Sequence, residues 1–154
     1  MRNWIKHLED PSWEAYPNTL LEFHGVRKIT VDLREPIKTD IRHALKSLGF
    51  EAAFAILTAC NPFGHHADEK ENRHRTNELA NDLSDLLVTM IPADGVSQDG
   101  NHRERGYAVA ILRPQAETLA MKYGQSSFFW FDGEQFWIIP GLIQAEPISL
   151  PCKV

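Results

Sequence analysis

FAILTACNPFGHHADEKENRHRTNE, residues 54–78, is the stretch of sequence that decides the fold. Almost all of its first residues are apolar, which is typical of a strand buried on both faces. Pro62 has no amide hydrogen and a fixed φ, so a strand cannot continue its pairing past this residue. The sequence therefore predicts a buried central strand over residues 54–60 that ends abruptly at Asn61.

A turn and a long helix follow this strand. Residues 63–67 must form the turn, and Asp68 with Glu71 is a capping-box-like pair that satisfies free amides at the start of a helix. The helix is predicted over about residues 69–90, with a core stripe at Leu79, Leu83, Leu86, Leu87 and Met90. Because ligands commonly bind where a central strand gives way to a helix N-terminus, we expect the functional site at this turn.

The rest of the chain supplies further strands and helices, separated by glycine and proline breaks. In chain order they are strands over 20–24 and 28–33, a helix around 37–48, an edge strand over 92–96, a central strand over 107–112, a helix over 114–124, strands over 127–131 and 135–139, and an extended tail. The order predicts an α+β fold with a ferredoxin-like βαββαβ core, N-terminal helix and hairpin additions and a C-terminal hairpin. We expect an antiparallel or mixed sheet with helices on one side.

Length and composition restrict the class of protein. The 154 residues are expected to form a single domain, residues 1–154, with a hydrophobic core. The net charge of −5 argues against nucleic-acid binding, which depends on a basic surface. No apolar run approaches the ~20 residues that span a bilayer, so no membrane association is expected. With two cysteines and no apolar signal region, the cytoplasm is the expected location.

The N-terminal segment is rich in aromatic residues. Trp4 lies in a first helical segment, and Trp13 and Tyr16 lie in a second short helix opened by Asp10 and Pro11. We expect these side chains to pack on the domain. The alternative is a homodimer contact, because exposed tryptophans are rarely left in water.

Four polar residues at the ends of elements are candidates for a binding site. Asn61 follows the central strand, and Asn72 occupies the buried-side position one heptad before the leucine stripe. Glu104 precedes the second central strand, and Gln125 follows a helix. Three amides and a carboxylate suit a ligand with hydrogen-bond donors and acceptors, and Glu104 is the candidate catalytic base. The alternative is that such amides only satisfy backbone groups.

Other polar residues near this turn have simpler explanations. Arg73, beside Asn72, could help to bind an anion at the helix N-terminus, but a solvated charged surface is the better explanation. Cys60 with a nearby histidine could form a thiol nucleophile, but its apolar strand favours a buried small side chain. His65 and His66 match no two-ligand metal motif, so no metal site is predicted.

The chain resembles domain-of-unknown-function family 3293, a family of small bacterial proteins, over about residues 15–131. The resemblance is carried by Ala15-Tyr16, Thr19, Thr58-Ala59-x-Asn61-Pro62, Asn72, Glu104 and Tyr123-Gly124-Gln125. It implies that Asn61, Asn72, Glu104 and Gln125 are the marked polar positions, and it implies no activity.

These observations support three functional hypotheses. The first is a binding site for a small polar molecule, such as a nucleobase, an amide or a sugar. This site would be enzymatic if Glu104 acts as a general base. The second is a protein-interaction or regulatory module whose surface is the aromatic N-terminus and the hairpin over 128–137. The third, a metal-dependent nuclease or hydrolase, has the least support, given the acidic charge and the ligand spacing. No glycine-rich phosphate loop or Walker pattern occurs, so the sequence assigns no cofactor.

Overall fold

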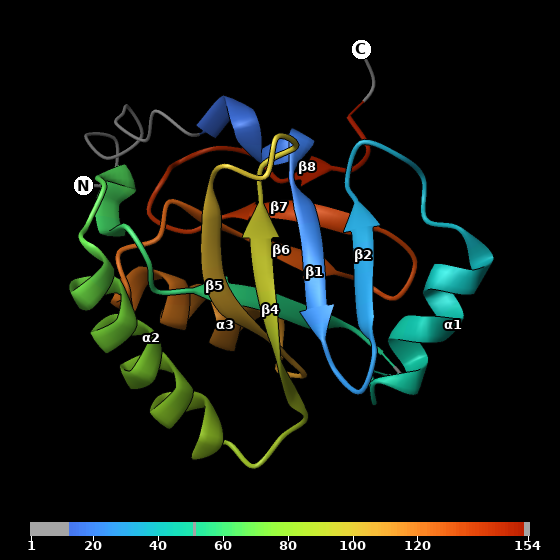
Figure 1. Cartoon of the computed structure of the whole chain (residues 1–154), viewed down its shortest axis with the longest axis horizontal. Helices are drawn as coiled ribbons and strands as arrows, with labels where there is room; N and C mark the ends of the chain where they lie inside the picture. The colour runs from blue at the N-terminus through green and yellow to red at the C-terminus, as the bar shows by residue number, and fades with distance from the viewer. Residues whose placement is uncertain (1–12, 51, 153–154) are drawn as a thin grey trace.

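The computed structural model describes residues 13–50 and 52–152, which form a curled sheet with helices around it (Figure 1). Within these residues the sheet has eight strands in the order β2-β1-β4-β5-β3-β6-β7-β8. The strands are β1 Leu20–His24, β2 Lys28–Asp32, β3 Phe54–Thr58, β4 Met90–Val96, β5 Arg103–Val109, β6 Ser127–Phe131, β7 Phe136–Pro140 and β8 Ile148–Ser149. The helices are α1 Thr39–Ser47, α2 Glu69–Ser84 and α3 Arg113–Lys122, with short 3₁₀ helices η1 Trp13–Asn18 and η2 Pro62–Gly64. None of the described helices has the length and apolar character that a membrane crossing requires.

Strand β3 lies between two hydrophobic cores. Phe54 and Ile56 belong to the inner core, which the curled sheet encloses together with α1. Ala55 and Leu57 point the opposite way, into the outer core that α2 and α3 cover. Figure 1 shows the curl, with β1, β2, β4 and β5 in front of β6, β7 and β8. The predicted burial of this strand on both faces is therefore confirmed.

The α+β class and most predicted elements are confirmed. β1 with β2 and β6 with β7 form the two expected antiparallel hairpins, and every other described strand pair is also antiparallel. Helix α2 begins where expected, because the Asp68 side chain accepts the Glu71 backbone amide at 2.7 Å. The expected placement of helices on one side is correct for α2 and α3 but wrong for α1, whose Leu45 is buried in the inner core.

Helix α2 is shorter than predicted. It ends at Ser84, and Leu87 beyond it has a left-handed φ of 56° and is 92% exposed. The chain has to turn here because Met90 already pairs with Val109, at the start of β4. The predicted core stripe is therefore wrong for Leu86 and Leu87, which are both exposed, whereas the two leucines that precede them in the stripe are buried.

The strand predictions need three corrections. β4 is not an edge strand, because β1 pairs along one side of it and β5 along the other. β5 begins at Arg103 and ends at Val109, so it starts and finishes earlier than the apolar run that predicted it. The tail, expected only to be extended, contributes β8 and pairs with β7.

Most aromatic residues of the last hairpin fill the cores. Phe128, Trp130 and Phe131 are buried, whereas Phe129 and Trp137 are half-buried, so only these two could contribute to the surface that the protein-interaction hypothesis assigned to the hairpin. Tyr16 packs against the inner core as expected, with its ring edge-on to Phe129 at 6.1 Å between centroids. The first predicted helical segment, with Trp4, lies outside the described residues.

Candidate functional site

The turn after β3 is fixed by backbone contacts. Asn61 takes the left-handed conformation, with φ 50° and ψ 59°, which asparagine tolerates better than most residues. The Phe63 amide donates to the Gly124 carbonyl at 2.6 Å. Gly124 has a φ of +70°, and a Cβ there would come within 2.9 Å of Pro62 Cβ. Tight packing at this glycine therefore holds the turn against the corner between α3 and β6.

Three of the predicted site residues form a continuous hydrogen-bonded chain. Asn72 Oδ1 accepts the Asn61 backbone amide at 2.9 Å, and Asn72 Nδ2 donates to Asn61 Oδ1 at 3.0 Å. Asn61 Nδ2 in turn donates to Glu104 Oε2 at 2.8 Å. The Ala67 amide also donates to Asn61 Oδ1, and the Ala67 carbonyl accepts from Asn72 Nδ2. The structure thus brings together groups from the β3 turn, the first turns of α2 and the start of β5.

Gln125 lies at the same end of the sheet but has different partners. Gln125 is 6% exposed, and its Nε2 donates to the carbonyls of Cys60 at 3.0 Å and Tyr123 at 3.1 Å. Arg75 supports the same corner, because its Nε donates to the Ala59 carbonyl and its Nη2 to the Tyr123 carbonyl. Gln125 and Arg75 therefore tie the end of β3 to the end of α3.

A small cavity opens beside Glu104 and Gln125, with a volume of about 50 Å³. It lies on the inner side of the curled sheet, where Ile56, Ala93 and Phe129 contribute apolar walls. The described residues that line it are Tyr16, Ile56, Leu57, Thr58, Ala93, Gly95, Glu104, Gln125, Ser127, Phe128 and Phe129. Asn61 and Asn72 are not among these residues, so they reach the cavity only through Glu104.

Glu104 is the one carboxylate among the described residues that line this cavity. Its side chain is 24% exposed, and His102 Nε2 lies 3.5 Å from Glu104 Oε2. The hydrogen bond to Glu104 raises the pKa of His102, against the opposing effect of partial burial. The cavity therefore has a negatively charged group at its rim that already attracts a titratable cation.

The other candidates near the turn take no part in this arrangement. Arg73 is exposed, and among the described residues its side chain makes no hydrogen bond or ion pair. Cys60 is buried, with Sγ 3.6 Å from the Arg105 carbonyl and 3.7 Å from Thr76 Oγ1, so it packs as a small buried side chain. Arg75, two residues further along α2, does not point to an anion site either, because its guanidinium donates to backbone carbonyls.

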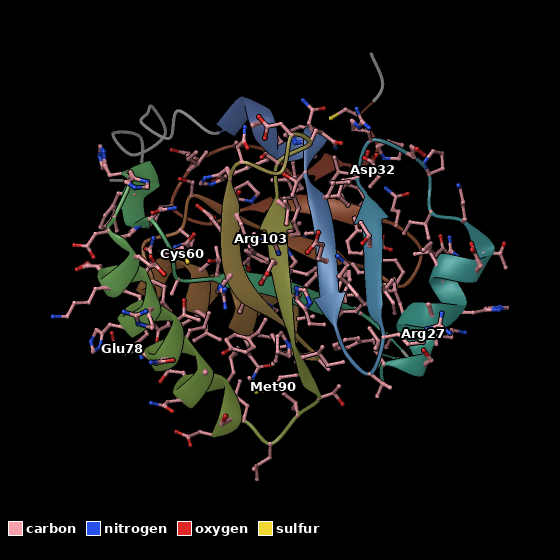
Figure 2. The ribbon with its side chains drawn as sticks, viewed as in Figure 1. Arg27, Asp32, Cys60, Glu78, Met90 and Arg103 are labelled. Carbon is pink, nitrogen blue, oxygen red and sulfur yellow. The ribbon has the colours of Figure 1, made fainter. Side chains whose placement is uncertain are left out.

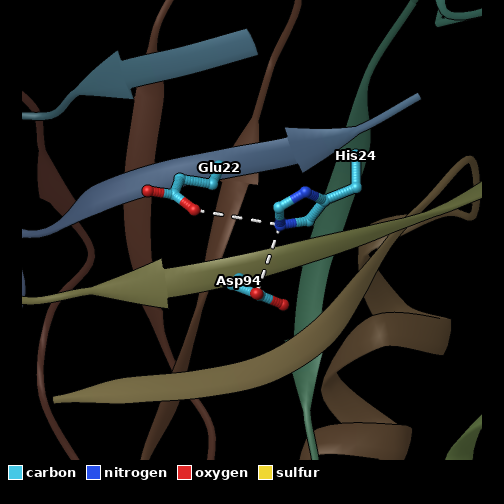
Figure 3. Close-up of side chains that lie close together, drawn as sticks. All are labelled: Glu22, His24 and Asp94. Carbon is cyan, nitrogen blue, oxygen red and sulfur yellow. Dashed lines mark hydrogen bonds and ion pairs between the residues drawn. The ribbon is translucent and has the colours of Figure 1, made fainter. Parts of the chain in front are cut away.

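A second polar cluster lies on the outer side of β1 and β4, and sequence reasoning missed it. Figure 3 shows Glu22, His24 and Asp94 together, with His24 Nε2 3.2 Å from Asp94 Oδ2 and 3.9 Å from Glu22 Oε1. One ligand atom from each lies within 4.8 Å of the others, which suits a metal ion. However, Arg103 Nη1 donates to Glu22 at 2.8 Å and to Asp94 at 2.7 Å.

The guanidinium of Arg103 therefore already supplies the positive charge that the two buried carboxylates require. It lowers the pKa of Glu22 by hydrogen bonding, although burial opposes this shift. Figure 2 shows Arg103 on the front layer of the sheet, on β5. We therefore describe Glu22, His24, Asp94 and Arg103 as an ion-pair network and not as a metal site.

The fold and the site define an α+β protein with a curled antiparallel sheet and a small, partly polar cavity at one end of β3. Residues 57–127 match the model of the family described as a protein of unknown function, DUF3293, which confirms the family resemblance. The matched segment contains Asn61, Asn72, Glu104 and Gln125. No curated protein and no solved structure matches the chain.

Proposed function

We propose that the protein binds a small polar molecule at the cavity lined by Glu104 and Gln125. The observation that carries this proposal is the convergence of a carboxylate, a buried amide and Ser127 on one cavity whose remaining walls are mostly apolar. Small-molecule sites generally combine apolar walls with a few placed polar groups. The volume of about 50 Å³ suits a small polar head group, with the rest of the ligand outside the cavity.

Asn61 and Asn72 act in this proposal as positioning residues. Both hydrogens of Asn72 Nδ2 are used within the protein, by Asn61 Oδ1 and the Ala67 carbonyl. Asn61 donates to Glu104 and therefore orients the carboxylate at the rim. A ligand would contact Glu104 and Gln125 directly, whereas the two asparagines would act through Glu104.

An enzymatic role for Glu104 extends the same proposal. A general base must reach the proton that it removes, and Glu104 is the carboxylate that borders the cavity. Its orientation by Asn61 at 2.8 Å supports this role. Turnover of a bound molecule that is lost in Glu104→Gln while binding persists would support catalysis.

Ligand-induced stabilisation tests the binding proposal. Thermal melting is measured with a panel of nucleobases, sugars, amides and amines for the wild type, Glu104→Gln and Glu134→Gln. Glu134 is an exposed carboxylate at the β6–β7 turn and serves as a matched control. We expect a compound that raises the melting temperature of the wild type and of Glu134→Gln by the same amount and that of Glu104→Gln by clearly less. Equal shifts in all three proteins, or none with any compound, would refute the proposal.

We also propose a ferredoxin-like arrangement for the segment from β3 to β6. Supporting this, β4, β5, β3 and β6 are consecutive in the sheet and antiparallel. In addition, α2 and α3 contribute to the same outer core. An experimental structure with a different strand order would overturn this assignment.

A further inference from the structure

We infer that the ligand presents a positively charged nitrogen with hydrogen-bond donors, an ammonium or guanidinium group, to this cavity. The inference rests on the proposed function and specifies the chemical class of its ligand. It follows from the hydrogen-bonding groups that the protein leaves without partners at the cavity, and from the charge that surrounds them.

Gln125 offers an acceptor and no free donor. Nε2 donates both of its hydrogens to backbone carbonyls, those of Cys60 and Tyr123. The opposite orientation of the amide would place Oε1 against the same two carbonyl oxygens, so the orientation is fixed. Oε1 has no hydrogen-bond partner among the described residues, and because every fully buried polar side-chain atom in them is paired, Oε1 is accessible to solvent. Gln125 lines the cavity, so a ligand N–H can donate to this free acceptor.

Glu104 and Ser127 add further unused acceptor capacity. Within the described residues, the hydrogen bond from Asn61 Nδ2 and the ion pair with His102 both involve Oε2 of Glu104. A carboxylate can accept about four hydrogen bonds, so acceptor sites remain free. Ser127 is 8% exposed and lines the cavity, and its hydroxyl has no hydrogen bond among the described residues. The cavity therefore presents two acceptors that cannot donate and one hydroxyl that can do either.

Charge selects against an anionic ligand. Among the described residues that line the cavity, none is lysine or arginine, and the single charged group is Glu104. Arg103 and Arg105 flank Glu104 along β5, but side chains alternate between the faces of a strand. Arg103 accordingly bonds Glu22 and Asp94 on the outer face. His102 lies 3.5 Å from Glu104 but does not line the cavity. An anion in the cavity would therefore meet the carboxylate directly, whereas a cation would gain a charge-assisted hydrogen bond.

The aromatic wall fits the same class of ligand. Phe129 and Tyr16 both line the cavity, and their rings make a T-shaped contact with 6.1 Å between centroids. Ammonium and guanidinium groups are attracted to aromatic faces within about 6 Å. A cavity of about 50 Å³ holds such a head group but not a whole sugar or base.

Four small probes that differ in charge test the inference: propylamine, propylguanidine, propionamide and propionate. Binding is measured by calorimetry and by chemical-shift perturbation for the wild type, Glu104→Gln and the control Glu134→Gln. We expect the two cations to bind the wild type and the control about tenfold or more tightly than propionamide, with no binding of propionate. Glu104→Gln keeps an acceptor for Asn61 and should lose about tenfold in affinity for the cations.

The outcomes separate the two proposals. If propionamide or propionate binds at this cavity as tightly as the cations do, the cationic class is wrong and the small-ligand site stands. If the cations bind Glu104→Gln as tightly as they bind the wild type, the inference is also wrong, because Glu104 is then not their partner. If none of the probes and none of the wider panel binds, the proposed function itself fails.

Discussion

Replacing Asn72 with alanine tests how much the hydrogen-bonded turn contributes to stability. The change removes three hydrogen bonds: to the Asn61 amide at 2.9 Å, to Asn61 Oδ1 at 3.0 Å and to the Ala67 carbonyl at 3.3 Å. At about 1 kcal/mol each, less for the longest, the loss is about 2.5 kcal/mol. Alanine recovers about 0.5 kcal/mol of helix propensity, so we expect a net loss of about 2 kcal/mol in the free energy of unfolding.

Urea unfolding followed by circular dichroism measures this loss. The matched control is Asn77→Ala, because Asn77 lies on the same helix, is exposed and has no hydrogen bond from its side chain among the described residues. The control should be as stable as the wild type or about 0.5 kcal/mol more stable. If Asn72→Ala and Asn77→Ala agree within about 0.5 kcal/mol, the network contributes nothing measurable and the reasoning is refuted.

Three further predictions concern other parts of the molecule. Arg103→Met should cost about 2 kcal/mol at neutral pH, because it removes the shortest ion pairs of the buried carboxylates of Glu22 and Asp94. Arg103 lowers the pKa of Glu22, so the stability from this ion pair is complete above the ordinary carboxyl pKa and is lost as pH falls through the lowered pKa. The free energies of unfolding of the wild type and Arg103→Met, measured with urea, should therefore converge in acid. Burial and Asp82 raise the pKa of Tyr123, so its phenol should stay protonated in alkaline absorbance titrations until the protein unfolds. The stabilisation from this shift is complete below the ordinary tyrosine pKa and is lost as pH rises from there through the raised pKa. Gly106→Ala should cost about 3 kcal/mol in thermal melting, because its Cβ would overlap a β3 carbonyl oxygen, whereas Gly95→Ala has room and should cost less.

The sequence predicted secondary structure correctly where the local pattern of apolar residues matches the burial of the side chains. The apolar run from Phe54 identified the central strand because it packs into a core on each face. The end of α2 could not be read in the same way, because the leucine spacing continues through Leu86 and Leu87 after the helix has ended. What stops the helix is the pairing of Met90 with Val109, a contact between strands that periodicity does not encode.

The same distinction holds for the candidate site. Asn72 and Glu104 were predicted to meet because one lies on the buried stripe of a helix and the other at the start of a central strand, and Asn61 joins them. Glu22 and Asp94 were missed because their proximity depends on the pairing of β1 with β4. Nothing local in the sequence indicates that pairing, since the two strands are far apart along the chain.

The left-handed conformation of Asn61 limits what evolution or an engineer can put at this position. Glycine suits a φ of 50° best, but it would remove the side chain that contacts Ala67, Asn72 and Glu104. A larger side chain could supply polar atoms but would resist the backbone geometry. Aspartate accepts the geometry but would turn a repelling charge toward Glu104. Asparagine is the residue type that meets the demands of main chain and side chain together.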